Sequence, residues 1–401
     1  MTGTGPLSVA ADELVGRVRR RFARDGASAT TAAVVAALRE QPGAAVLGDE
    51  ALLRLAGRVH ADLVGAGPLA PLLADPAVTD ILVNNGAVWV DRGDGLQRVP
   101  LDLGDGGDVR RLAQRLVAAG GRRLDDSAPY ADVRLPDGTR LHAVLPPVAT
   151  HGPCLSLRTF RQRPFTLPEL VETGAFDAGV AELLAAVVAA RLAYLVTGGT
   201  GTGKTTLLAA LLSLVPSAER IVLVEDAAEL RPRHPHVVSL QTRTPNVEGA
   251  GAVTLQDLVR QALRMRPDRI VVGECRGAEV ADLLSALNTG HEGGAGTLHA
   301  NAPADVPARL EALGLLGGLP RPALHAQVAA ALQVGLHLRR RSGARVLEAV
   351  YLLQPTGPER LVTTVPAWRR GQGPGPGAAR LRELLVDRGV APPAVLDGGP
   401  R

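Results

Sequence analysis

The chain has 401 residues, of which 46% are hydrophobic and only 2% aromatic, and its 44 basic and 40 acidic side chains leave a net charge of +4. This composition indicates a globular protein of two or three domains, and its near balance of charges does not indicate a nucleic-acid-binding surface. The two cysteines, Cys154 and Cys275, cannot by themselves form a disulfide framework or a metal site, and their scarcity is typical of a reducing compartment.

The first part of the chain is predicted to contain a helical region, a small domain and a linker. Apolar residues recur at helical spacing near the N-terminus, which predicts a helical region over residues 1–66. Residues 67–163 contain short alternating runs with turn signals, such as VTDILVNNG and ADVRLPDGTRLHAVLPP, and one helical segment near residues 107–119. This pattern predicts a small α+β domain. Two prolines in the next segment indicate a linker over residues 164–176.

The second half of the chain alternates helices of ten or more residues with short apolar strands. The strand-like segments between residues 177 and 370 are AYLVTG, RIVLVED, HVVSLQ, RIVVGE and AGTLHA. This alternation predicts an α/β domain over residues 177–370, with a mainly parallel sheet and helices on its faces. Residues 371–401 are predicted to form a flexible break rich in Gly and Pro, followed by a short amphipathic helix.

Residues 196–206 read VTGGTGTGKTT and contain Lys204, the only lysine in the chain. The stretch matches G-x-x-x-x-G-K-[ST] between a predicted strand and a predicted helix, which is the context that this phosphate-binding motif requires. Its backbone N–H groups would surround the phosphates, Lys204 would reach the β and γ phosphates, and Thr205 would hold Mg²⁺. We therefore expect ATP and Mg²⁺ as ligands. The predicted nucleotide-binding residues are Gly198, Gly199, Thr200, Gly201, Thr202, Gly203, Lys204, Thr205 and Thr206.

Two later strands end in carboxylates, RIVLVED with Glu225 and Asp226, and RIVVGE with Glu274. Because the carboxyl ends of parallel strands face the ligand crevice, these acids are expected near the phosphates. One would hold Mg²⁺ through its water shell, and the other would orient the attacking water. The alternative is that an acid at a strand end caps a neighbouring helix.

The stretch NTGHEGGAGTLHAN places two histidines, His291 and His299, around a glycine-rich turn. His299 ends a predicted strand, where a neutral imidazole could sense the γ-phosphate and couple its loss to movement. A structural histidine is the alternative. A zinc site is not favoured, because the two histidines are not at helical ligand spacing and no cysteine lies nearby.

These ordered motifs resemble the Walker A, Asp box, Walker B and His box of the secretion-superfamily traffic ATPases. The similarity is greatest to the CpaF/TadA branch, which powers tight-adherence (Flp-type) pili, and it covers about residues 68–350. The resemblance implies a RecA-like P-loop motor domain with a smaller PAS-like N-terminal domain. It also implies a homo-hexameric ring that hydrolyses ATP and docks on polytopic inner-membrane platform proteins. Direct nucleic-acid binding is not expected, because the chain has few aromatic residues and nearly balanced charges.

The resemblance also implies roles for individual residues. Glu225 would be the Asp-box acid that activates water, and Glu274 the Walker B acid that acts near Mg²⁺, together with Thr205. His291 and His299 would be the His-box residues. The chain departs from the family at residues 293–296, which read GGAG where a serine-containing stretch is common. Three arginines match those of the family's N-terminal domain, some of which act as arginine fingers: Arg134, Arg140 and Arg158.

Three alternatives to a pilus or secretion motor follow from the same motifs. A conjugation-type (type IV) secretion ATPase has nearly identical motifs, although the long helical region before residue 67 favours the pilus branch. A DNA translocase or helicase should show a basic surface with aromatic side chains, which the composition does not support. A nucleotide-binding scaffold without hydrolysis would not need intact acids at positions 225 and 274.

The cellular location follows from what the N-terminal and apolar segments lack. The first residues do not form a basic region followed by an apolar core, so no signal peptide is expected. The most apolar stretch, which starts at Glu182, is interrupted by Arg191 and is shorter than the ~20 residues of a membrane span. We therefore expect a cytoplasmic protein that associates with the membrane through its partners.

Overall fold

The structure is a computed structural model, in which the chain divides into two units, Met1–Arg161 and Gln162–Arg401. Most of the predicted helical region over residues 1–66 lies outside the described residues. Within it, α2 (Thr31–Arg39) is helical, and its Val34 and Leu38 are buried in a small apolar cluster. The structure describes residues 17, 18, 21, 31–42, 48, 52, 53, 55–57, 59, 65–93, 95–159, 164–243, 245, 250–341 and 343–397.

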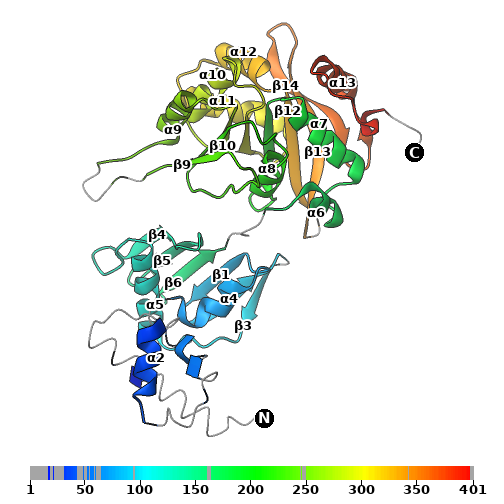
Figure 1. Cartoon of the computed structure of the whole chain (residues 1–401). Coiled ribbons are helices and arrows are strands. Elements are labelled where there is room, and N and C mark those ends of the chain that lie inside the picture. The colour runs from blue at the N-terminus through cyan, green and yellow to red at the C-terminus, as the bar shows by residue number, and fades with distance from the viewer. Residues whose placement is uncertain are drawn as a thin grey trace. The chain divides into compact units, whose positions relative to one another are not determined.

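The N-terminal unit contains a six-stranded antiparallel sheet in the order β3-β2-β1-β6-β5-β4 (Figure 1). Alternate residues of the strands are buried against α5 (Gly106–Ala119), which begins with a capping box between Asp105 and Asp108. Because strand residues alternate between the faces, polar residues lie on the face opposite α5. The predicted α+β class is therefore confirmed. The strands are β1 (Asp80–Asn84), β2 (Ala87–Asp91), β3 (Leu96–Val99), β4 (Tyr130–Arg134), β5 (Arg140–Val144) and β6 (Cys154–Arg158), preceded by η2 (Gly67–Leu69) and α4 (Ala70–Ala74).

The C-terminal unit contains a nine-stranded sheet in the order β15-β14-β13-β12-β7-β11-β10-β8-β9. The six strands from β12 to β9 in this order run parallel to one another, and the last three strands of the chain extend the sheet in antiparallel fashion. The strands are β7 (Tyr194–Gly198), β8 (Ile221–Glu225), β9 (Val237–Gln241), β10 (Arg269–Cys275), β11 (Ala295–His299), β12 (Val334–Arg341), β13 (Ala344–Thr356), β14 (Leu361–Arg369) and β15 (Gly373–Pro374).

Helices cover both faces of this sheet (Figure 1). In β7, Tyr194 and Val196 are buried on one face, and Leu195 on the other, so this central strand contributes to two cores. Such burial on both faces is typical of parallel sheets. One face is covered by α6 (Leu167–Glu172), α7 (Ala178–Ala189), α8 (Lys204–Leu212) and α13 (Ala378–Asp387). The other is covered by α9 (Leu255–Ala262), α10 (Glu279–Asn288), α11 (Val306–Leu316) and α12 (Arg321–Ala331). Short 3₁₀ turns are η3 (Leu263–Met265), η4 (Pro303–Asp305) and η5 (Ala394–Leu396).

Two segments that we predicted to be irregular are instead built into this unit. The linker predicted over residues 164–176 contains α6, because Thr166 and Glu169 form a capping box and Leu167 is buried in the core. The flexible break predicted over residues 371–377 contains β15, which pairs with β14, and the N–H of Gly377 donates a hydrogen bond to the carbonyl oxygen of Pro366. The backbone of a glycine-rich segment can form hydrogen bonds with the edge strand of a sheet, although its residues do not show the alternating apolar pattern that predicts a strand.

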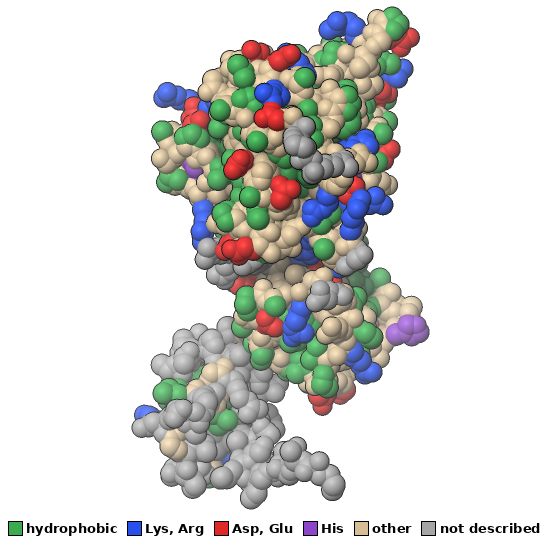
Figure 2. Space-filling view, turned by 90° about the vertical axis from the view of Figure 1, so that its right-hand side faces the viewer, with side chains coloured by type: hydrophobic (Ala, Val, Ile, Leu, Met, Phe, Trp, Pro, Cys, Tyr) green, Lys and Arg blue, Asp and Glu red, His purple; other side chains and the backbone are tan. Residues whose placement is uncertain are grey.

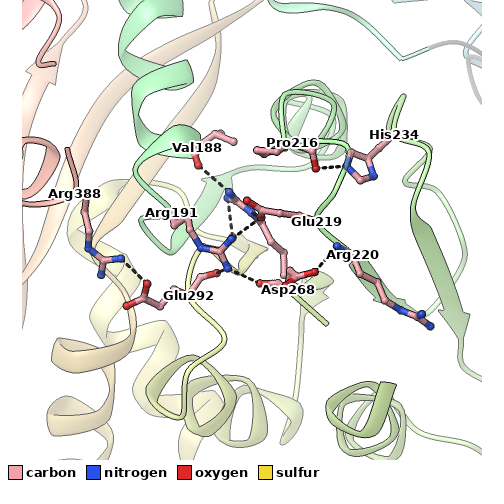
Figure 3. A network of polar contacts seen from close by, with 11 residues as sticks. Val188, Arg191, Pro216, Glu219, Arg220, His234, Asp268, Glu292 and Arg388 are labelled. Carbon is pink, nitrogen blue, oxygen red and sulfur yellow. Dashed lines mark hydrogen bonds and ion pairs between the residues drawn. The ribbon is translucent and has the colours of Figure 1, made fainter. Parts of the chain in front are cut away.

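A polar network ties the amino ends of the parallel strands together, and Figure 3 shows it from close by. The side chain of Arg269 is only 1% exposed, and its Nε donates to Glu219 Oε2 at 2.7 Å. Arg191 pairs with the same carboxylate oxygen at 2.8 Å. Arg388, after α13, pairs with Glu292 at 2.6 Å, in the loop before β11. This network fixes the edge of the sheet opposite to the one at which the strands end.

Charges of both signs are interspersed on the face of the described residues that Figure 2 shows. On the side that Figure 2 shows, Lys and Arg side chains of the described residues lie among Asp and Glu side chains. Among the described parts of the chain, each helix is too short or too polar to span a bilayer.

Candidate nucleotide site

The motif at residues 198–204 forms a tight loop between β7 and α8. Gly198, Gly201 and Gly203 have φ angles of 149°, 70° and 93°, which L side chains rarely adopt. A Cβ atom at Gly198 would also lie 2.5 Å from the carbonyl oxygen of Leu338 on the neighbouring strand. The strand, turn and helix expected around this motif are therefore present, and the loop needs glycine at these positions.

Lys204 is the first residue of α8, and its ammonium folds back over the loop. Its Nζ donates to the carbonyl oxygens of Gly198 at 3.1 Å and of Gly199 at 2.9 Å. A compact ammonium can rotate among such acceptors and phosphate oxygens, whereas a planar guanidinium needs more room. The first turn of α8 also contains Thr205 and Thr206, where the backbone N–H groups of a helix terminus attract anions.

The sheet order brings the other predicted residues to the same edge. Gly198, His299, Glu274 and Glu225 lie at or near the carboxyl ends of β7, β11, β10 and β8, which are consecutive neighbours in the sheet. His299 is directly opposite Gly198 in the β11–β7 register. Four segments that are separated in sequence therefore converge at the sheet edge that contains the loop, which is where ligands bind in such sheets.

Glu225 is only 3% exposed, and backbone groups orient its carboxylate. Its Oε1 accepts hydrogen bonds from the N–H groups of Glu229 at 3.0 Å and Leu230 at 2.9 Å. These groups lie in the loop after β8, so the carboxylate does not cap a helix with them. The side chain fits because residue 273 is glycine: a Cβ atom there would lie 2.7 Å from Glu225 Cγ.

Glu274 has a cationic partner that we did not predict, Arg276. The two side chains form a hydrogen-bonded ion pair, and Arg276 also lies 3.8 Å from Asp226 Oδ2. The hydrogen bond to Glu274 is the main cause that raises the pKa of Arg276. Glu279 accepts from the N–H groups of Arg276 at 2.6 Å and Gly277 at 2.8 Å, which fixes the turn after β10. A basic residue two positions after a strand-end acid was the only sequence signal for this pair.

The two histidines lie at opposite ends of β11. His299 is at the carboxyl end, near the loop, whereas His291 precedes the strand and its Nδ1 lies 3.1 Å from the carbonyl oxygen of Ala286. The structure thus brings His299 to the site within this chain and does not bring His291 there. The glycines between them are needed for packing, because a Cβ atom at Gly294 would lie 2.4 Å from Leu287.

The three arginines of the N-terminal unit lie side by side on its sheet. Arg134 is opposite Arg140 in the β4–β5 register, and Arg140 is opposite Arg158 in the β5–β6 register. Arg140 pairs with Asp132 at 2.8 Å, and the pKa of that carboxyl is lowered, mainly by this hydrogen bond. Arg140 and Arg158 border a shallow cavity of about 310 Å³ together with Asp80.

A further arginine, which the sequence analysis missed, contacts the glycine-rich loop within the C-terminal unit. The Nε of Arg345, at the start of β13, donates to the carbonyl oxygen of Gly201 at 3.1 Å. The two residues are 144 positions apart in the sequence, so no local sequence pattern predicts their contact. It results from the β12–β13 hairpin, in which β12 runs beside β7 and continues past Gly198.

Comparison with known proteins agrees with this arrangement. The family described as "Type II/IV secretion system protein" matches residues 62–349. The chain belongs to this family. Family membership implies nucleotide binding, and it confirms, at the level of the family, the resemblance that the four motifs indicated.

Individual members of the family are similar over most of the chain. A putative conjugal transfer protein of Mycobacterium tuberculosis (strain H37Rv) is 56% identical over 354 residues, which are 86% of this chain and 100% of that protein. The type IV secretion system protein PtlH of Bordetella pertussis is 33% identical over 69% of this chain and 89% of its own length. The pilus retraction motor PilT, solved with bound ADP, has a TM-score of 0.53 at 22% identity and covers 73% of this chain and 83% of that one. At that identity, the likeness shows the fold, which is that of a RecA-like motor with an N-terminal domain.

Proposed function

We propose that this protein is an ATP-hydrolysing motor of a type II/IV secretion machine, working as a homo-hexamer at the cytoplasmic face of the membrane. The observation that carries the proposal is the convergence of the loop 198–204, Glu225, Glu274 and His299 at one edge of one sheet. A binding scaffold would need the loop but not two acids and a histidine at the ends of the adjoining strands.

Each of the residues at this edge has a separate role in phosphoryl transfer. The loop N–H groups and Lys204 hold the β and γ phosphates, where they oppose the charge that develops in the transition state. Glu225 accepts the proton of the attacking water, and its two backbone hydrogen bonds hold the carboxylate in one orientation. His299 senses the γ-phosphate and passes its loss to the segment after β11.

Thr205 and Glu274 are the residues that would hold Mg²⁺. Their hydroxyl and carboxylate oxygens are the ligands that Mg²⁺ takes, and Arg276 bonds to only one of the two carboxylate oxygens of Glu274, so the other oxygen would serve the ion. When bound, Mg²⁺ would neutralise charge on the phosphate oxygens.

We assign the arginine row of the N-terminal unit, Arg134, Arg140 and Arg158, to the phosphates of a neighbouring subunit. An arginine finger supplied by a neighbour is worth about 10³ to 10⁵ in rate. Contacts that join different surfaces of two subunits generate rings when the rotation closes, which fits a hexamer. Arg140 is paired with Asp132, and the Nε of Arg134 donates to the carbonyl oxygen of Gly138, so Arg158 is the arginine that we expect to matter most.

Two machines fit this motor. We favour a tight-adherence (Flp-type) pilus of the CpaF/TadA branch, because the sequence predicts a long helical region before residue 67. Its partners would be polytopic inner-membrane platform proteins. A conjugation-type secretion system is the second candidate, and it is favoured by the names of relatives, one a putative conjugal transfer protein and another a type IV secretion protein.

Mixing inactive subunits tests the shared site. Arg158→Ala lacks the donated arginine and Lys204→Ala lacks the receiving loop, so each alone should be nearly inactive, whereas mixed rings contain interfaces with both groups intact. We expect the mixture to recover part of the hydrolysis, and the wild-type rate per subunit to rise with protein concentration. Arg111 lies on α5, which covers the face of the N-terminal sheet opposite to the three arginines, so Arg111→Ala should remain active without a second variant. Full activity of a monomer, or rings of mixed subunits that recover nothing, would refute the shared site.

A further inference from the structure

The β12–β13 hairpin extends beyond the end of β7 and carries four arginines at the edge of the sheet that contains the glycine-rich loop. The register pairs β12 with β7 as far as Leu338, which is opposite Gly198, so the last residues of β12 lie past the strand end where the loop begins. The arginines of this hairpin tip are Arg339, Arg340, Arg341 and Arg345. Because the chain as a whole has nearly balanced charges, such a group at this edge calls for an explanation.

Arg345 occupies an electrostatically unfavourable position in this hairpin. It is directly opposite Arg340 in the β12–β13 register, and two like charges in such a pair destabilise a sheet. Each of the two arginines is two positions from a leucine, Leu338 or Leu347, of the core that includes α8, so both arginines lie on the face that α8 covers. An arginine at position 345 therefore needs a favourable contact that offsets the repulsion.

That contact is with the glycine-rich loop. The Nε of Arg345 donates to the carbonyl oxygen of Gly201 at 3.1 Å. Its Cδ lies 3.5 Å from the position that a Cβ atom at Gly203 would take, so the aliphatic part of the side chain lies along the loop. A hydrogen bond from a cation to a carbonyl is stronger than one between neutral groups. Arg345 thus holds the loop by one peptide group, the one between Gly201 and Thr202.

The bond from Arg345 fixes the orientation of a backbone donor as well as that of the carbonyl. The peptide between Gly201 and Thr202 is trans, so its N–H points in the direction opposite to its carbonyl and away from Arg345. Thr202 is only 6% exposed, and its N–H has no hydrogen-bond partner within the described part of the chain. Leaving a buried N–H without a partner costs free energy, and an anion held by the loop would satisfy it.

The glycine on the carbonyl side makes this peptide easy to turn. Gly201 has a φ angle of 70°, which L side chains rarely adopt, and glycine populates several other conformations at little cost. Without a partner for its carbonyl, the peptide could rotate and direct its oxygen, instead of its N–H, toward the phosphates. A carbonyl oxygen in that direction would repel phosphate oxygens. The loop needs a contact that selects one orientation of the peptide, and Arg345 supplies it.

We propose that Arg345 is a positioning residue for nucleotide binding, which holds the Gly201 carbonyl outward so that the N–H of Thr202 faces the β-phosphate. The β-phosphate is the group that both descriptions of this loop motif place against its backbone N–H groups. The inference rests on the proposed function in that the loop must bind a nucleoside diphosphate or triphosphate, but it does not require hydrolysis. The Nε–H of Arg345, and not its charge, is the group that acts.

Two substitutions of similar length separate the hydrogen bond from the charge. In Arg345→Gln, the side-chain Nε2 is attached to Cδ, as Nε is in arginine, so a donor remains and the charge is lost. Arg345→Met has neither the donor nor the charge. Equilibrium titrations with ADP and with AMP measure the dissociation constants, and AMP is the ligand control because it lacks the β-phosphate.

We expect Arg345→Met to weaken ADP binding about tenfold, which is the effect of one hydrogen bond to a charged group, and AMP binding by less than about threefold. Arg345→Gln should stay within about threefold of the wild type for both nucleotides. Merely structural damage would not spare AMP binding, and it would not be rescued by glutamine.

Arg339→Met is the matched control for the charge of the hairpin tip. Arg339 is exposed, and it precedes Arg340 in β12, so its side chain lies on the opposite face of the sheet. This variant should bind both nucleotides as the wild type does. The thermal unfolding midpoint of each variant is measured beside binding, and if Arg345→Met does not fold, Arg345→Ala, which also lacks the donor, is held to the same criteria.

Three results would overturn the proposal. They are wild-type affinity of Arg345→Met for ADP, equal weakening of ADP binding in Arg345→Met and Arg345→Gln, which would assign the effect to charge, and equal weakening of ADP and AMP binding in Arg345→Met. Failure of the proposed function gives a different result: wild-type protein that binds ADP but hydrolyses no ATP would count against the motor and leave the role of Arg345 in place.

Discussion

The contact between Gly273 and Glu225 allows the position of the carboxylate to be changed without altering its chemistry. In Gly273→Ala, the added Cβ atom would lie 2.7 Å from Glu225 Cγ and 3.3 Å from Oε1, whereas ordinary contacts begin at 3.4 Å. The Glu225 side chain must therefore retreat by about 0.7 Å (3.4 − 2.7), against the two backbone hydrogen bonds that hold it. A misplacement of about 1 Å can lower a rate by about 100-fold. We expect kcat to fall roughly 30- to 100-fold.

Steady-state ATP hydrolysis, nucleotide binding and thermal unfolding together separate this effect from general damage. Nucleotide affinity should change less than about threefold, because the loop 198–204 is not touched, and overpacking should cost about 1–3 kcal/mol of stability. Gly179→Ala is the control, since its Cβ atom would meet Val395 at an ordinary 3.5 Å. If folded Gly273→Ala protein turns over at the wild-type rate, the position of the Glu225 carboxylate does not matter, and its assignment as the base is wrong.

Three further predictions concern the loop, the buried network and pH. Lys204→Arg keeps the charge but crowds the loop, so ATP hydrolysis should be lost and nucleotide binding much weakened; wild-type turnover would contradict this. Arg269→Met leaves Glu219 paired with Arg191 and removes the hydrogen bonds of the Arg269 guanidinium, and chemical denaturation should show a loss of about 2 kcal/mol, against little change for the exposed Arg380→Met. Burial lowers the pKa of His337 below its ordinary 6.5, so the stability from the neutral ring is present above pH 6.5 and is lost as the pH falls toward the folded value. The unfolding midpoint should therefore fall more between pH 7.5 and 5 in wild type than in His337→Gln. Equal falls would show that burial of the neutral His337 ring does not contribute to the loss of stability at low pH.

The parts of the site that could be predicted are those that local sequence encodes. The loop motif fixes its own backbone, because glycine is needed at each left-handed φ, and the flanking strand and helix are recognisable from their apolar residues. Glu225 and Glu274 could be assigned to the same edge because each follows a short apolar run, and parallel strands end together. Their order in the sheet, β7-β11-β10-β8, then brings them near the loop.

The parts that were missed depend on contacts between distant segments. The side chains of His337 and Tyr351 form hydrogen bonds with Thr197, which is 140 and 154 residues away, and nothing near either residue indicates a partner on β7. Arg345 reaches Gly201 only because β12 lies beside β7. His291 and His299 are close in sequence, and we predicted both at the site. They lie at opposite ends of β11, so only His299 is near the loop in this chain.

If this edge of the sheet hydrolyses ATP with Glu225 as the base, Glu225→Gln should abolish hydrolysis and spare nucleotide binding. The amide keeps the size of the side chain and removes its ability to accept a proton, while the loop and Glu274 remain. Release of phosphate from ATP should be measured with and without Mg²⁺, beside equilibrium binding of ATP. We expect the wild type to hydrolyse ATP only with Mg²⁺, and we expect Glu225→Gln protein to bind ATP with near wild-type affinity and to release almost no phosphate. Hydrolysis by Glu225→Gln at a rate close to the wild type would contradict the role of Glu225 as the base.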